Sequence, residues 1–139
     1  MTCFYLVLDP RNGRLRYANA GHCLPYQRTH TGVVELSARG MPLGLMPGMV
    51  YEEHDTCLAP GDTLLLHSDG LAEAHDADRE MFGFPRLQRL VAHHRAAETM
   101  IAVLLAELDR FTSCEYDDDI TLLTLTRTTI PQTADDIPT

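Results

Sequence analysis

Alternation of apolar and polar positions runs through the first third of the chain, as is typical of antiparallel β-strands. Residues 3–9 are apolar on both faces, and residues 14–20 alternate large apolar with polar or small side chains. An Asn-Gly pair at 12–13 lies between these runs and is a strong signal for a tight hairpin. We expect a second hairpin over residues 23–37, with Gly32 in its turn.

Residues 38–49 break this pattern. They contain three glycines and two prolines, which exclude regular structure and predict a loop. A further strand is expected within residues 50–59. The Pro-Gly pair at 60–61 then precedes the continuous apolar run of residues 63–68, which indicates a buried central strand.

The spacing of apolar positions changes after residue 80. Leu87, Leu90 and Val91 fall on one face of a helix, and residues 100–111 carry a second apolar stripe with helical spacing. β-branched residues return at 120–128 and predict a last strand. Strands followed by two helices and a final strand indicate an α+β fold with a mainly antiparallel sheet.

The length and charge of the chain restrict its class and partners. A chain of 139 residues fits one domain, which we assign to residues 1–127, with residues 128–139 as a flexible tail. The formal net charge of −9 argues against nucleic acid as a partner. No apolar run approaches the roughly 20 residues of a membrane helix, and no leader is evident, so we expect no membrane span, signal peptide or anchor. The four cysteines are widely separated and predict free thiols in a reducing cytoplasm.

Two acidic clusters carry the candidate chemistry. Asp69 ends the buried strand, where Gly70 is expected to let the backbone turn sharply, and three aspartates at 117–119 precede the last strand. If those strands are antiparallel neighbours, both clusters meet at one rim of the sheet. Crowded carboxylates repel unless they are protonated or neutralised by a cation, and oxygen ligands favour Mg²⁺, Mn²⁺ or Ca²⁺. The competing interpretation is a strand-ending turn and a solvated acidic loop.

Other metal sites have weaker support. A calcium loop counted from Asp76 needs Gly at its sixth position and Glu at its twelfth, where this chain has Met81 and Leu87. A transition-metal site from His67, Asp69 and His75 would require the end of the strand to stay extended, and single histidines are more often structural or solvated.

Five ordered motifs resemble those of the SpoIIE-type serine phosphatases, which belong to the metal-dependent PPM protein phosphatases. The resemblance covers residues 1 to about 127, and the motifs are "LDPRNGRLRYANAGHCLPY", "GMPLGL", "LAPGDTLLLHSDGLAEA", "MFG" and "DDDITLLTL". It implies a sandwich of two antiparallel sheets flanked by helices, with a binuclear Mn²⁺ or Mg²⁺ site at the sheet edge.

The same resemblance implies roles for single residues. Asp69 and Asp118 correspond to metal ligands, and Asp119 takes a second, alternative ligand position beside them. The metals would activate a water that attacks phosphorus directly. The "AGH" and "PLG" segments at 21–22 and 42–44 are expected to shape loops near the site. Neither Asp62 nor Glu73 is expected to be catalytic.

The family also has an aspartate–glycine motif upstream of the part that matches Met1, and this chain has no counterpart of it. We therefore expect the N-terminal part of the domain to be missing and the chain alone to be weakly active or inactive. The implied substrate is a phosphorylated protein such as an anti-anti-sigma factor. The alternatives are a catalytically incomplete module that binds a partner, including a homodimer through exposed sheet edges, and a simple acidic cation-binding domain.

Overall fold

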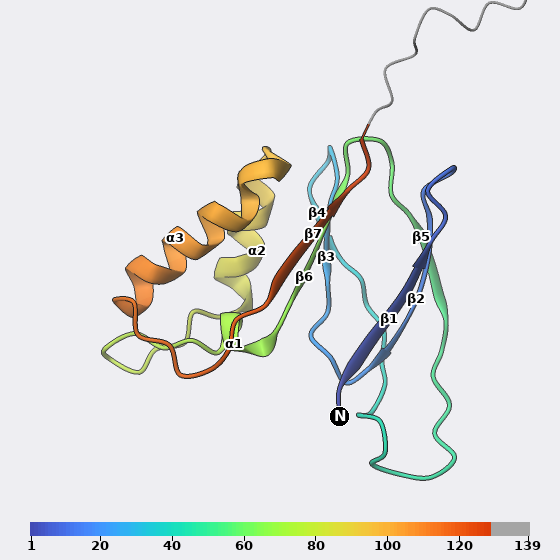
Figure 1. Cartoon of the computed structure of the whole chain (residues 1–139), viewed down its shortest axis with the longest axis horizontal. Coiled ribbons are helices and arrows are strands. Elements are labelled where there is room, and N and C mark those ends of the chain that lie inside the picture. The colour runs from blue at the N-terminus through green and yellow to red at the C-terminus, as the bar shows by residue number, and fades with distance from the viewer. Residues whose placement is uncertain (129–139) are drawn as a thin grey trace, which may run out of the picture.

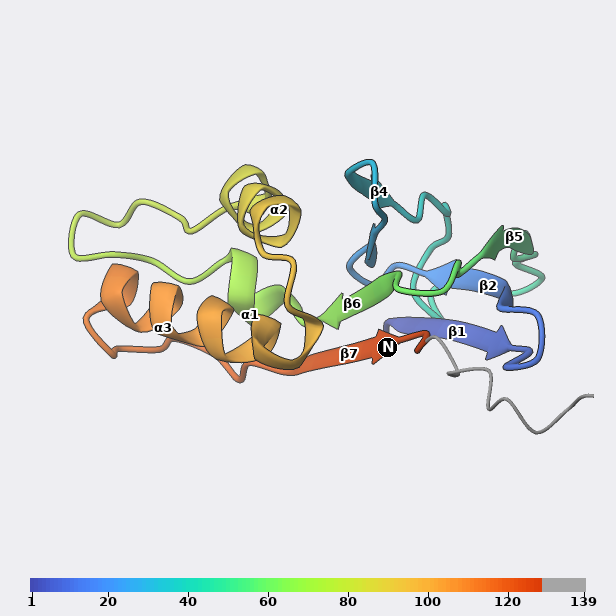
Figure 2. The same ribbon diagram turned by 90° about the horizontal axis from the view of Figure 1, so that it is seen from above.

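Two antiparallel sheets and a pair of helices form three layers in the computed structural model, which describes residues 1–128 (Figures 1 and 2). The first sheet has the order β1-β2-β5 and the second the order β4-β3-β6-β7. The helices cover the face of the second sheet that points away from the first sheet (Figure 2). This arrangement confirms the expected α+β sandwich of antiparallel sheets.

The first sheet is built on the hairpin predicted at the Asn-Gly pair. Its strands are β1 (Cys3–Leu8), β2 (Arg14–Ala20) and β5 (His54–Cys57). β2 pairs with both neighbours in antiparallel register, and Gly13 adopts a φ of +76° in the turn. Glycine adopts this left-handed conformation without the steric penalty that other residues incur.

The second sheet contains the expected buried strand at its centre. Its strands are β3 (Tyr26–Arg28), β4 (Val33–Glu35), β6 (Thr63–His67) and β7 (Leu122–Thr126). β6 lies between β3 and β7 and is antiparallel to both. Successive residues of β6 face opposite sides of the second sheet and so belong to two separate core clusters. Leu64 packs between the two sheets with Leu15, whereas Leu65 packs beneath the helices with Leu87.

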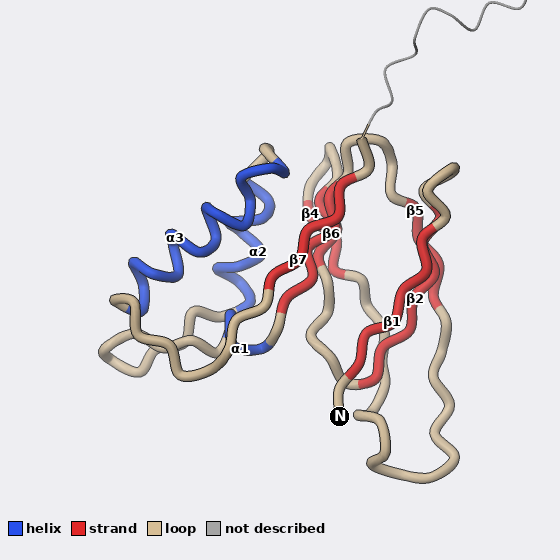
Figure 3. Tube along the Cα trace, in the orientation of Figure 1, coloured by secondary structure: helices blue, strands red, loops and turns tan. Residues whose placement is uncertain are grey.

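The helical layer consists of α2 (Phe84–His93) and α3 (Met100–Thr112), joined through a short 3-10 turn, η1 (Ala97–Thr99) (Figure 3). α3 begins and ends close to the predicted residues 100–111, and α2 contains the predicted apolar face of Leu87, Leu90 and Val91. Val91 and Leu104 are fully buried against the second sheet, as the helical spacing predicts. None of the helices within residues 1–128 has the length and apolar character needed to cross a membrane.

Three elements differ from the sequence-based expectation. A four-residue helix, α1 (Asp69–Ala72), follows β6 directly and was not predicted. β3 begins only at Tyr26, because Pro25 precedes it and has no N–H to donate to a ladder. β5 is four residues long, so the loop before it extends beyond the predicted residues 38–49. The predicted flexible tail lies, from residue 129 onward, outside the described residues.

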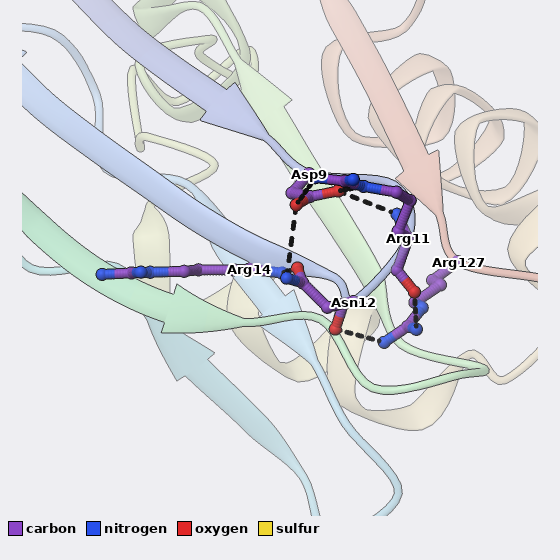
Figure 4. Close-up of polar contacts among 5 residues, drawn as sticks. All are labelled: Asp9, Arg11, Asn12, Arg14 and Arg127. Atoms are coloured by element: carbon purple, nitrogen blue, oxygen red, sulfur yellow. Dashed lines mark hydrogen bonds and ion pairs between the residues drawn. The ribbon is translucent and has the colours of Figure 1, made fainter.

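The two sheets are joined by side-chain hydrogen bonds at the β1–β2 turn (Figure 4). Arg127, just after β7, donates through its guanidinium to the carbonyls of Asn12 and Leu58, at 2.9 and 2.8 Å. The turn itself is held by Asp9, whose carboxylate accepts hydrogen bonds from Arg11 and Asn12. The end of one sheet therefore contacts the hairpin turn of the other through a single side chain.

Candidate metal centre

The pairing of β6 with β7 brings the two acidic clusters to one edge of the second sheet. The ladder ends at the pair His67 and Leu122. Beyond it, the backbone N–H of Ser68 donates to the carbonyl of Thr121 at 3.0 Å, and the N–H of Thr121 donates to Ser68 Oγ at 2.9 Å. Ser68 Oγ in turn donates to the carbonyl of Asp119 at 3.2 Å. Ser68 thus aligns the acidic loop with the end of β6.

Gly70 lies against the acidic loop, in a role that differs from the expected one. It is helical, in the first turn of α1, so the sharp turn predicted for it does not occur. A Cβ at this position would collide with the backbone carbonyl of Asp119, and it would also contact Cβ of Asp118 at 3.6 Å. Glycine is needed here because the backbone of a distant segment approaches closely.

The candidate ligands Asp69, Asp118 and Asp119 are solvent-exposed carboxylates. Asp69 Oδ1 accepts from the N–H of Gly70 at 3.0 Å, and Asp118 Oδ1 accepts from the N–H of Asp119 at 2.7 Å. Within residues 1–128, none of the ion pairs involves Asp69, Asp118 or Asp119. These three carboxylates therefore form a surface of negative charge that no cationic side chain of the described residues neutralises.

Asp117 has a different environment from its two neighbours. Its carboxylate lies 3.5 Å from Nδ1 of His75 and 3.9 Å from the guanidinium of Arg79. These residues line a shallow depression of about 370 Å³, which also contains Glu73 and Asp118. Asp117 therefore contributes to holding the loop, whereas Asp118 is left available to a ligand.

The carboxylates at this edge are the type of ligand that a hard divalent ion prefers, but they are few. Exposed carboxylate oxygens are the ligands that Mg²⁺ and Mn²⁺ prefer. Among the residues that the structure describes, however, no group of three or more His, Cys, Asp or Glu side chains is close enough to hold a metal. The alternative set of His67, Asp69 and His75 is likewise not assembled, because His67 is buried and stacks on Tyr26 at 5.7 Å.

The "AGH" and "PLG" segments contact each other, in agreement with the loop-shaping role expected for them. Gly21 has a φ of +73°, and a Cβ there would collide with the ring of Pro42. The buried side chain of Asn19 fixes the turn that follows, since its amide donates to the carbonyls of His22 and Ala38 and its oxygen accepts from the N–H of His22.

Two residues were not singled out for a functional role from the sequence, Asn19, which holds the turn after β2, and Cys23 beside Asp69. Asn19 could have been recognised as a polar residue at an inward position of a strand. Cys23 lies close enough to Asp69 and Glu73 for their charges to contribute to its titration. Burial is the main cause that raises the pKa of the Cys23 thiol, and the two carboxylates raise it further.

Comparison with known proteins supports the family resemblance found in the sequence. The family model described as Stage II sporulation protein E (SpoIIE) matches residues 1–128. Protein IcfG of Synechocystis and the phosphoserine phosphatase RsbU of Bacillus subtilis are each 29% identical to this chain, over 129 and 131 residues. The phosphatase domain of SpoIIE from Bacillus subtilis, in its Mn-presoaked form, has a similar fold with a TM-score of 0.77 at 19% identity.

This chain spans only part of each of these proteins. It matches over 91% of its own length to both curated relatives but covers 20% of IcfG and 39% of RsbU. The structural match includes 99% of this chain and 61% of the SpoIIE phosphatase domain. Because the family model matches residues 1–128 and the overall fold is similar to that of the SpoIIE phosphatase domain, the chain belongs to the SpoIIE family of PPM-type serine phosphatases.

Proposed function

We propose that this chain forms the C-terminal part of a metal-dependent protein serine/threonine phosphatase domain. Asp69 and Asp118 are its metal ligands, with Asp119 as the alternative ligand and Gly70 as the adjacent backbone. The metal is Mn²⁺ or Mg²⁺. The single observation that carries the proposal is the antiparallel pairing of β6 and β7, which places Asp69 and the 118–119 pair at one edge of the sheet.

Other residues of this chain position the proposed ligands at this edge of the sheet. Ser68 fixes the relative position of the two strand ends through bonds to Thr121 and Asp119. The carboxylate of Asp117 pairs with His75 and Arg79, whereas the carboxylate of the neighbouring Asp118 stays available to a cation. When bound, paired divalent ions supply hydroxide at neutral pH and neutralise charge on phosphoryl oxygens.

The isolated chain is expected to be weak or inactive as an enzyme. Two carboxylates leave most positions around a hard cation to water or to ligands outside residues 1–128. The proposed substrate class is a phosphorylated protein, in keeping with the similarity to the phosphoserine phosphatase RsbU. An anti-anti-sigma factor is the proposed partner, as the family resemblance implies. A homodimer through sheet edges is a separate proposal, for which β1 and β7 offer edges within the described residues.

Calorimetric titration with Mn²⁺ tests the ligand assignment. We expect Asp118→Asn and Asp69→Asn each to weaken Mn²⁺ binding by roughly tenfold or more, because affinity for hard cations depends on the charge of the ligands. Asp117→Asn is the matched control, since it removes the same charge one residue away from a carboxylate already paired with His75 and Arg79. Its Mn²⁺ affinity should change by about twofold at most.

Equal loss in the Asp117 and Asp118 variants would show only a diffuse attraction between Mn²⁺ and an acidic surface, and would contradict the proposed site. A phosphoserine peptide assay provides the second measurement. Turnover by the unmodified chain that requires Mn²⁺ and disappears in Asp69→Asn would support the ligands and overturn the expectation that the chain alone is weak.

A further inference from the structure

A second charged surface, basic rather than acidic, lies in the groove between α2 and α3. The groove encloses about 580 Å³ and is lined by side chains from both helices. The lining includes Arg86, Arg89 and His93 on α2, and Glu107, Arg110 and Phe111 on α3.

The sequence of α2 makes this groove positive in a chain that is otherwise acidic. The chain has 20 Asp and Glu residues, yet none occurs between residues 84 and 97. Arg86, Arg89 and His93 recur at helical spacing and lie on one side of α2, facing α3. Helix α3 adds Arg110, and Glu107 is the one carboxylate in the lining.

The single carboxylate of the groove is already engaged. Arg110 donates from one guanidinium nitrogen to both oxygens of Glu107, at 2.6 Å each. Within residues 1–128, neither Arg86 nor Arg89 forms an ion pair, and Arg89 makes only a local hydrogen bond to the carbonyl of Pro85 at 3.3 Å. Two arginines of the groove therefore carry charge that no carboxylate of the described chain neutralises.

Arg86 is held in place without a salt bridge. Its guanidinium lies over the ring of Phe111 at 4.2 Å and over that of Phe82 at 5.3 Å from the ring centroids. Stacking of this kind orients the planar guanidinium while its edge N–H groups stay available to an acceptor. Phe111 also provides an apolar floor, so the groove combines oriented donors with a hydrophobic surface.

We propose that the α2–α3 groove docks an acidic segment of a partner protein, in which carboxylates pair with Arg86 and Arg89 and an apolar side chain packs on Phe111. Charge complementarity selects this occupant, because two uncompensated arginines match a peptide that carries several carboxylates and an apolar residue. The site is separate from the metal ligands, so its occupancy does not depend on the proposed phosphatase activity.

Fluorescence anisotropy with the full 139-residue chain tests the proposal. The probe is a labelled peptide of about 12 residues that alternates Glu with Leu, so that its carboxylates and its apolar side chains lie on opposite faces of an extended chain. The double variant Arg86→Glu/Arg89→Glu should weaken binding roughly tenfold or more, since it replaces attraction with repulsion. The matched control is Arg39→Glu/Arg95→Glu, which makes the same charge change at exposed positions outside the groove and should alter binding by about twofold at most.

Circular dichroism on both double variants establishes that they fold. Equal weakening by both would show general repulsion by an acidic protein and overturn the groove as a site. Equal binding of a Gln–Leu peptide would show that carboxylates are not recognised, and would also overturn it. Tight binding of a phosphoserine peptide with no other acid, together with failure of the Glu–Leu peptide, would assign the groove to phosphate instead.

Discussion

Gly70 packs so closely against the carbonyl of Asp119 that position 70 has no room for a side chain. The two residues are 49 positions apart in the sequence and lie beyond the same end of the β6–β7 ladder, Gly70 after β6 and Asp119 before β7. Their contact ties the first turn of α1 to the acidic loop. The position of Asp118 relative to Asp69 therefore depends on a backbone contact as well as on the strand register.

Gly70→Ala tests whether this contact matters. Helix propensity alone predicts that alanine in α1 stabilises the protein by about 1 kcal/mol. The contact predicts the opposite sign, a loss of about 1–3 kcal/mol, because the added methyl group displaces backbone rather than a flexible side chain. Urea unfolding measures the difference. An unfolding free energy that rises in the variant would contradict the close packing.

Arg127 is expected to stabilise the contact between the two sheets. Arg127→Ala should lower the free energy of unfolding by about 2 kcal/mol, because it removes charge-assisted bonds to the carbonyls of Asn12 and Leu58. Arg127→Lys should recover only part of this, since lysine lacks the fork that reaches two acceptors. The control is Arg11→Ala, whose exposed side chain pairs with Asp9 alone and whose loss should leave the urea midpoint nearly unchanged.

Asp62, for which the sequence predicts no catalytic role, is expected to have a structural role. Its buried carboxylate accepts from the amide of Gln27 at 2.9 Å and from the N–H of Ala59 at 3.0 Å, and so holds the turn before β6. Asp62→Ala should cost about 2–3 kcal/mol of unfolding free energy, since Gln27 and Ala59 lose a charged acceptor. Calorimetry should find Mn²⁺ affinity unchanged. Loss of metal binding at full stability would instead place Asp62 in the metal site.

The sequence predicted the elements that depend on local pattern. The apolar run of β6, the Asn-Gly turn and the helical stripe on α3 each specify their own structure, and the meeting of the two acidic clusters followed from one assumption about strand pairing. Contacts between distant segments could not be predicted in this way. Gly70 was read as a turn residue because a glycine in isolation indicates conformational freedom, whereas its actual neighbour comes from the acidic loop.

The same limit applies to side chains that act across elements. Arg127 was unremarkable in the sequence, because its acceptors are carbonyls of two turns in the other part of the fold. The Arg86 stack on Phe111 joins two helices whose relative position no periodicity specifies. Separating Asp117 from Asp118 likewise required the structure, since only the positions of His75 and Arg79 distinguish the two carboxylates.

His67 is expected to make stability depend on pH. Burial lowers the pKa of its imidazole below the usual 6.5, because the charged form would lose its hydration beside Tyr26. The unfolded chain therefore binds a proton more readily than the folded chain. The contribution of His67 to stability is complete above pH 6.5 and is lost as the pH falls from that value toward the lower pKa of the folded state.

His67→Phe should remove this dependence and keep an aromatic ring against Tyr26. We expect the free energy of unfolding of the unmodified protein to fall more steeply than that of the variant between about pH 7.5 and pH 5, the range in which a depressed histidine exerts its effect. Urea unfolding at several pH values measures both slopes. Because every other titrating group is common to the two proteins, parallel slopes would mean that His67 accepts its proton equally well in the folded and unfolded chains, which is incompatible with a neutral, buried imidazole.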